Sequence, residues 1–206
     1  MLQEKVNIQR GNTKLGKVLN VSLPPGRTCP PSVPCFNQGC YARKFYHLRG
    51  ACRNAWDHNY ALAMTKRDFY FEFIRATVAL GEPELFRWHV SGDIPDADYL
   101  VRMIAVAQAC PKTRFLCFTK QYGIVAAQPW KGRGARAVKN LNVVVSAWPG
   151  LPIPAELRSF PTAWMRDRKN PDPRIPADAV ECDGGCDTCG LCWMLEPGRS
   201  VVFVKH

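Results

Sequence analysis

The sequence lacks the marks of a membrane or exported protein. No stretch approaches the roughly 18 consecutive apolar residues that a membrane-spanning helix needs. The first residues also lack a basic start followed by the roughly 7–15 apolar residues of a secretory signal. Neither an internal repeat nor a low-complexity tract is present. We therefore expect a cytoplasmic protein with no membrane association.

Acidic residues are scarce relative to basic ones. Lys and Arg number 28 against 17 Asp and Glu, a formal net charge of +11. This excess favours an anionic partner, either nucleic acid or a nucleotide-like substrate. One short stretch could contact phosphates and stack on a base: Trp130, Lys131, Arg133, Arg136 and Lys139. The alternative is a solvated basic face.

Cysteine, by contrast, is abundant, with 10 in 206 residues. A chain of this length forms one domain, at roughly 100–200 residues per domain, and can bury a real core. Disulfides are therefore not needed to hold a small fold together. Thiols stay reduced in the cytoplasm, so clustered cysteines there indicate metal ligands or catalytic groups.

Apolar segments alternate with segments of helical periodicity. Six strands are predicted, at residues 16–23, 84–90, 114–119, 142–147, 162–165 and 200–205. Helical spacing covers 41–80, with an interruption near Gly50, and 96–109, which Asp96 can cap. Strands separated by helices indicate βαβ units and a mainly parallel sheet. The strands are apolar runs, as expected when both faces of the sheet are covered.

The predicted fold class is α/β, a partial (β/α)6 barrel or an open, mainly parallel sheet, with a C-terminal cysteine-rich metal-binding segment. Residues 1–206 form a single domain. Its parts are an α/β core at 1–180 with a cluster loop at 29–40, a metal loop at 181–193 and a returning strand at 199–206. In parallel sheets the chemistry lies at the carboxyl ends of the strands, where the loop at 29–40 begins.

The first cysteine group is Cys29, Cys35 and Cys40, spaced C-x5-C-x4-C. Three cysteines in one loop can hold three irons of a [4Fe-4S] cluster and leave the fourth iron open to a ligand. An open coordination position is what a catalytic metal needs. Cys52 could complete a four-thiolate set, which would make the site a closed cluster or a zinc site.

The second group follows the pattern C-x3-C-x2-C-x2-C and consists of Cys182, Cys186, Cys189 and Cys192. Its short spacings are typical of a four-iron cluster, and zinc is the alternative at this group. Cys110 and Cys117 stand apart, and we interpret both as buried free thiols that act as small hydrophobic residues.

The order of a strand, a three-cysteine loop, a helix and a second strand with a Gly-acid turn resembles the layout of the radical SAM superfamily. Several motifs also resemble the phage "gene product 88" family over roughly residues 15–205. These motifs are Cys29-Pro-Pro-Ser, Cys35, Gly39-Cys-Tyr-Ala, Trp88-His-Val-Ser-Gly-Asp-Ile, Phe118-Thr-Lys and Cys182-Asp-Gly-Gly-Cys-x2-Cys-Gly-x-Cys-Trp.

The resemblance implies a partial (β/α)6 barrel with a [4Fe-4S] cluster on Cys29, Cys35 and Cys40. It also implies S-adenosylmethionine on the open iron, with its amino group received by the turn Ser91, Gly92 and Asp93. Each gap between the three cysteines is two residues longer than the superfamily's usual C-x3-C-x2-C.

Three further residues are catalytic candidates, because each ends or nearly ends a predicted strand. His89 would share a strand face with Arg87 and Ser91 if the strand alternates, and its alternative role is a hydrogen-bonded core residue. Lys120 could bind a carboxylate or phosphate, or it is an ordinary surface lysine. Arg166 could clamp an anion.

Three functions remain open from the sequence. The first is a small radical-SAM-like enzyme acting on an anionic substrate, which needs a reductant. The second is a metal-stapled nucleic-acid-binding protein of phage type. The third is an iron–sulfur redox protein that carries electrons without S-adenosylmethionine.

Overall fold

The computed structural model describes residues 4–128 and 138–204. Its helices are α1 (Cys35–Gln38), α2 (Tyr41–Leu48), α3 (Gly50–Thr65), α4 (Arg67–Gly81), α5 (Ala97–Ala109), α6 (Tyr122–Ala126), α7 (Cys186–Cys189) and α8 (Leu191–Met194), with a 3-10 turn η1 at Ala155–Leu157. Its strands are β1 (Gln9–Arg10), β2 (Leu19–Val21), β3 (Leu85–Trp88), β4 (Arg114–Thr119), β5 (Leu141–Ser146), β6 (Thr162–Arg166), β7 (Val180–Glu181) and β8 (Ser200–Val204). Within these ranges no helix combines the length and apolar character needed to cross a membrane.

One eight-stranded sheet organises the chain, in the order β1-β2-β3-β4-β5-β6-β8-β7. Every neighbouring pair is parallel except β1 with β2. The prediction of an open, mainly parallel sheet is therefore confirmed, and all six predicted strands are present. Over the described residues β1 and β7 are the two edges of the sheet, so the sheet does not close on itself.

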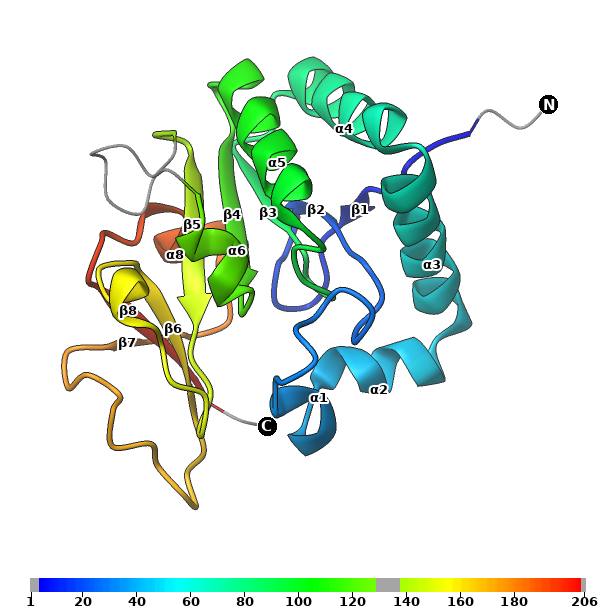
Figure 1. Ribbon diagram of the computed structural model, residues 1–206. Coiled ribbons are helices and arrows are strands. Elements are labelled where there is room, and N and C mark those ends of the chain that lie inside the picture. The colour runs from blue at the N-terminus through cyan, green and yellow to red at the C-terminus, as the bar shows by residue number, and fades with distance from the viewer. Residues whose placement is uncertain (1–3, 129–137, 205–206) are drawn as a thin grey trace.

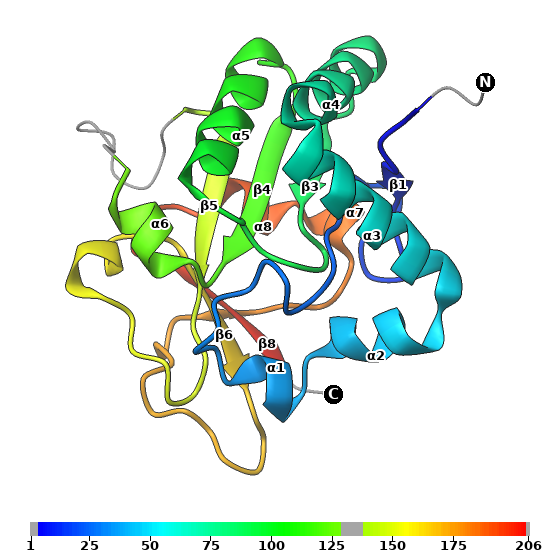
Figure 2. The ribbon, with the colours of Figure 1, turned by 45° about the vertical axis from the view of Figure 1, so that its right-hand side comes forward.

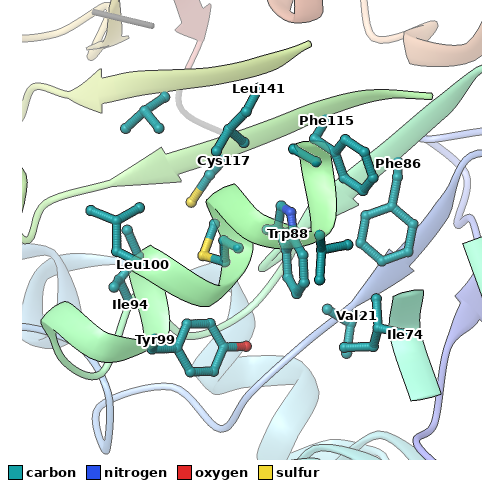
Figure 3. Close-up of a cluster of buried hydrophobic side chains, with 14 of the residues drawn as sticks. Val21, Ile74, Phe86, Trp88, Ile94, Tyr99, Leu100, Phe115, Cys117 and Leu141 are labelled. Atoms are coloured by element: carbon teal, nitrogen blue, oxygen red, sulfur yellow. The ribbon is translucent and has the colours of Figure 1, made fainter. Parts of the chain in front are cut away.

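The apolar strands bury residues on both faces of the sheet, as the sequence predicted. Along β4, Phe115 and Cys117 belong to one buried cluster and Leu116 to another. Helices α4 and α5 cover the first face (Figures 1 and 2), where Trp88, Phe86, Phe115 and Tyr99 pack closely (Figure 3). Buried aromatic side chains of this kind contribute much of a core's stability.

The C-terminal cysteine-rich segment covers the opposite face. Its Trp193 packs with Leu116 and Val144, and its indole Nε1 donates to the Phe86 carbonyl at 2.9 Å. Asn142 of β5 donates to the carbonyls of Cys192 at 2.8 Å and Leu195 at 3.1 Å. The buried amide of a strand thus orders the backbone that carries the second cysteine group.

The long helical stretch at 41–80 is three helices, not one interrupted once. The break near Gly50 is confirmed, and it lies at Arg49, whose backbone is extended. A second break at Lys66 was not predicted, because no glycine or proline marks it. There Arg67 begins α4 and pairs with Asp96 at 2.8 Å and Asp98 at 3.1 Å, which ties α4 to the start of α5.

The start of α5 matches its predicted cap. The Asp96 carboxylate accepts a hydrogen bond from the Tyr99 amide at 2.9 Å, which satisfies one of the free amides of the first turn. The cap places the adjacent turn, residues 91–95, at the carboxyl end of β3 beside the loop that follows β2.

Candidate metal centre

The first cysteine loop lies at the carboxyl ends of the parallel strands, as predicted. It leaves β2, forms α1 and continues into α2, and both helices lie at the end of the sheet toward which β4 and β5 point (Figures 1 and 2). The loop is tied to the sheet by Thr28, whose hydroxyl accepts from the Asp93 amide at 2.9 Å. The Thr28 carbonyl accepts from the Gln121 side chain at 2.8 Å.

The three thiols of this loop are free, half-buried and within electrostatic reach of one another. Burial raises the pKa of Cys29 to about 12, against a hydrogen bond from the Gly26 amide, and the charges of Asp93, Cys35 and Cys40 raise it further. Burial also raises the pKa of Cys35, while the ammonium of Lys120 lowers it. A raised pKa keeps the thiols of Cys29 and Cys35 protonated at neutral pH, so metal binding to these two residues must release protons.

Three cysteine thiols are the type of ligand that a four-iron cluster requires. All ten cysteines lie in the described part of the chain, and none forms a disulfide. In residues 4–128 and 138–204, no three Cys, His, Asp or Glu side chains are close enough to hold a single metal ion. In a four-iron cluster each thiolate binds a different iron, so the ligands stand farther apart than around one ion. The Gly26 amide donates to Cys29 Sγ at 3.4 Å, as amides do around bound clusters.

Cys52 is separated from the loop by the whole of α2. That helix has 8 residues, which span roughly 12 Å. Cys52 then lies in the first turn of α3. The prediction that it completes a four-thiolate set stays untested.

The turn after β3 uses both oxygens of its carboxylate within the protein. Asp93 accepts from Thr119 Oγ1 at 2.6 Å and from the amides of Lys120 and Ile94, each at 2.8 Å. Burial raises the pKa of Asp93, and these hydrogen bonds counteract the rise. Gly92 has φ 80°, and a Cβ there would lie 2.9 Å from the Leu23 carbonyl oxygen. Asp93 and Gly92 thus hold the turn against the β2 loop.

Ser91 is the member of this turn with an unused polar atom. Its side chain is buried, and its Oγ has no hydrogen-bond partner among the residues described. An unpaired buried hydroxyl costs free energy unless a ligand or water satisfies it. The role of Ser91, Gly92 and Asp93 in binding S-adenosylmethionine remains a prediction.

His89 does not lie where strand alternation places it. Its φ of 59° turns the backbone after β3, and its Nε2 lies 3.1 Å from the Tyr99 hydroxyl of α5. Arg87 lies over the Phe118 ring instead, at 4.9 Å from the guanidinium carbon to the centroid, on the opposite face. The expectation that His89 and Arg87 share a face is therefore wrong. With 3% exposure, His89 is a core residue, and burial lowers its pKa to about 3.

The other two catalytic candidates separate. Lys120 lies at the rim of the first cysteine loop, where its charge acts on Cys35 and its Nζ is 5.7 Å from the Trp148 ring centroid. Arg166 instead pairs with Glu181 of β7 at 2.7 Å, which anchors an edge strand of the sheet. Of the three candidates, the structure brings only Lys120 to the first loop.

Backbone hydrogen bonds fix the position of the second cysteine group. The Cys182 amide donates to the Val202 carbonyl at 2.9 Å, and the Cys186 amide donates to the Lys14 carbonyl at 3.0 Å. Burial raises the pKa of Cys192 to about 12. The neighbouring thiolates of the group raise this pKa as well, so all four sulfurs lie in one electrostatic environment.

Sequence reasoning missed the role of Arg87, which lies between the two cysteine groups. Burial raises the pKa of Cys186 and Cys192 on one side and of Tyr41 on the other, and the charge of Arg87 counteracts the rise at all three. Tyr41 in turn donates its hydroxyl proton to the Val90 carbonyl. The Arg87 Nε is buried and has no hydrogen-bond partner within the described chain. A charged residue inside an otherwise apolar strand was the sequence signal for this role.

A hollow of about 310 Å³ opens beside the first loop, between α1 and α2. Its lining consists of Phe36, Asn37, Gly39, Cys40, Arg43, Lys44 and His47. Cys40 therefore has one side toward a space lined by basic side chains. Of the basic stretch expected to contact phosphates, residues 130–136 lie outside the described residues.

Comparison with known proteins gave one result. The family model described as gene product 88 matches residues 3–195, which include both cysteine groups. Neither a curated protein nor a solved structure matches the chain.

Cys110 and Cys117 are buried and lie apart from both cysteine groups, as predicted.

Proposed function

The chain belongs to the phage gene product 88 family, and we propose that it is an iron–sulfur protein. In this proposal it is a small radical-SAM-like enzyme that acts on an anionic, nucleotide-like or nucleic-acid-like substrate. One observation carries the proposal. Three free, half-buried thiols of a single loop stand within electrostatic reach of one another at the carboxyl ends of a parallel sheet.

Cys29, Cys35 and Cys40 would each hold one iron, with the fourth iron open to S-adenosylmethionine. Together with an external one-electron reductant, a bound cluster and cofactor would supply radical chemistry, the removal of a hydrogen atom from a substrate. The protein's own groups would bind and orient. Ser91 Oγ, at the turn after β3, has no hydrogen-bond partner among the described residues, and Lys120 places a cation beside Cys35. We also propose that the open sheet corresponds to the partial (β/α)6 barrel of the radical SAM superfamily.

The second group would hold a four-iron cluster, with zinc as the alternative; one zinc ion requires its thiols to move closer together than they stand in the described residues. Four thiolates carry more negative charge than either metal supplies positive charge, so nearby cations stabilise the loaded site. Arg87 and Lys14 both act on Cys186 in this sense. With iron, this site would pass electrons toward the first loop.

Metal analysis with electron paramagnetic resonance on anaerobically purified protein tests the proposal. We expect the wild type to contain iron and sulfide. The triple variant Cys29→Ala, Cys35→Ala, Cys40→Ala should contain less iron and sulfide, by the amount of one cluster. The matched control removes the two buried thiols that lie in neither group, Cys110→Ala and Cys117→Ala. Unchanged iron in the triple variant, or iron-free wild-type protein, would refute the proposal.

Release of 5′-deoxyadenosine from S-adenosylmethionine with a reductant separates the enzyme from a simple electron carrier. The charge of +11 favours one competing function, a metal-stapled nucleic-acid-binding protein. That function predicts zinc, no 5′-deoxyadenosine, and nucleic-acid affinity that falls steeply with salt.

A further inference from the structure

Two cationic side chains, Arg43 and Lys44, line the hollow between α1 and α2 together with His47. Arg43 and His47 are four residues apart on α2 and so lie on one side of the helix, with Lys44 beside them. Among the described residues neither Arg43 nor Lys44 takes part in an ion pair, whereas Arg67 and Arg102 each pair with two aspartates. Like charges held together without a counter-ion repel, which an anionic ligand would relieve.

Arg43 is held in place before any ligand arrives. Its guanidinium carbon lies 4.9 Å from the centroid of the Phe36 ring, a cation–π distance. Its Nη1 also donates to the Phe36 carbonyl at 3.4 Å. Gly39, with φ 135°, lets the chain turn between the two helices and brings Phe36 against Arg43. The remaining guanidinium N–H groups are available to a ligand, at a low cost in side-chain entropy.

We infer that this hollow binds the phosphate group of a small nucleotide. The planar fork of Arg43 matches two phosphate oxygens, and Lys44 adds a point charge. Asn37 supplies an amide that can donate to a sugar or base. The hollow is open to solvent, and its volume of about 310 Å³ corresponds to a small ligand, so we take a single nucleotide as its ligand.

The position of the hollow connects this ligand to the chemistry. Cys40 is part of its lining, so a bound nucleotide would lie against the first cysteine loop. The binding itself needs only the side chains named above. That the nucleotide is the substrate rests on the proposed function.

The test compares binding of AMP and adenosine by isothermal titration calorimetry, on protein whose iron content is measured in the same preparation. We expect AMP to bind at least tenfold more tightly than adenosine. The double variant Arg43→Gln, Lys44→Gln removes charge-assisted hydrogen bonds and should weaken AMP binding about tenfold or more. The matched control is Arg168→Gln, Lys169→Gln, an Arg–Lys pair that is exposed in the loop after β6 and should leave binding unchanged.

A second measurement needs no variant. Phenylglyoxal modifies accessible arginines, and AMP should protect Arg43 but not Arg168 in the wild-type protein, as read by peptide mass spectrometry. Equal binding of AMP and adenosine, or no protection of Arg43, would overturn the inference. So would a DNA oligonucleotide that binds far more tightly than AMP through the same two residues, because the phosphate would then belong to nucleic acid.

The two proposals fail in different ways. AMP binding by iron-free wild-type protein would leave the hollow as a nucleotide site and refute the iron–sulfur proposal. Iron-loaded protein without selective AMP binding would refute the nucleotide site and leave the iron–sulfur proposal standing.

Discussion

The substitution His89→Asn distinguishes a core histidine from a catalytic one. The His89 side chain is 3% exposed and bonded to the Tyr99 hydroxyl. Asparagine tolerates the positive φ of 59° at this position better than most residues and cannot take up a proton in this pH range. Loss of the ring and its hydrogen bond should lower the free energy of unfolding by about 2 kcal/mol at pH 7.

The pH dependence carries the sharper test. The pKa of His89 is about 3 in the folded protein, against an ordinary value of 6.5. Between these values the unfolded chain takes up a proton at this site and the folded protein does not. The wild type therefore loses stability as pH falls below 6.5, by up to about 1.4 kcal/mol per pH unit. The asparagine variant lacks this loss, so the gap between the two proteins should narrow by about 2 kcal/mol from pH 6.5 to 4.5.

Urea unfolding followed by tryptophan fluorescence at pH 6.5, 5.5 and 4.5 measures this gap. The buried Asp93 titrates in both proteins, so its contribution cancels in the difference. His47→Asn, at an exposed position, controls for the loss of one histidine. A gap that stays constant or widens as pH falls would show that His89 is not held neutral in the core.

Three more substitutions test the cysteine loops and their supports. Gly16→Ala places a Cβ 1.8 Å from the Asp187 carboxylate at φ 60°. It should lower the free energy of unfolding by about 1–3 kcal/mol and reduce the metal content of the second group. Gly150→Ala, with a similar φ and open space, is its control, and equal metal content in the two variants would contradict the clash. Arg87→Gln should speed metal loss from the second group to a chelator, because a charge that favours thiolates is removed; equal rates would count against Arg87 as its counter-ion. Asn59→Ala breaks hydrogen bonds to Asn7 and Ser22 and should lower the free energy of unfolding in urea by about 3 kcal/mol. Asn54→Ala, at an exposed position on the same helix, should change this free energy little.

Local patterns predicted much of this fold because they report local physics. An apolar run predicted each of the six longer strands, and Asp96 predicted the start of α5. The two-residue strands β1 and β7 carry no periodicity of their own, since each exists only by pairing with a longer neighbour. Next to the break at Lys66, Arg67 forms ion pairs with residues about 30 positions away, a contact that no local pattern contains.

The candidate sites divide in the same way. Their composition follows from the sequence alone: cysteine spacing defined two groups, and strand order placed the first at the carboxyl end of the sheet. Tertiary contacts determine which other side chains lie near these cysteine groups. His89, with its positive φ, lies in the core, Arg166 pairs with Glu181 of the edge strand β7, and Arg87 lies between the two cysteine groups. The reason is physical: spacing determines which side chains can meet, whereas burial and pairing determine which charges act on one another once the chain is packed.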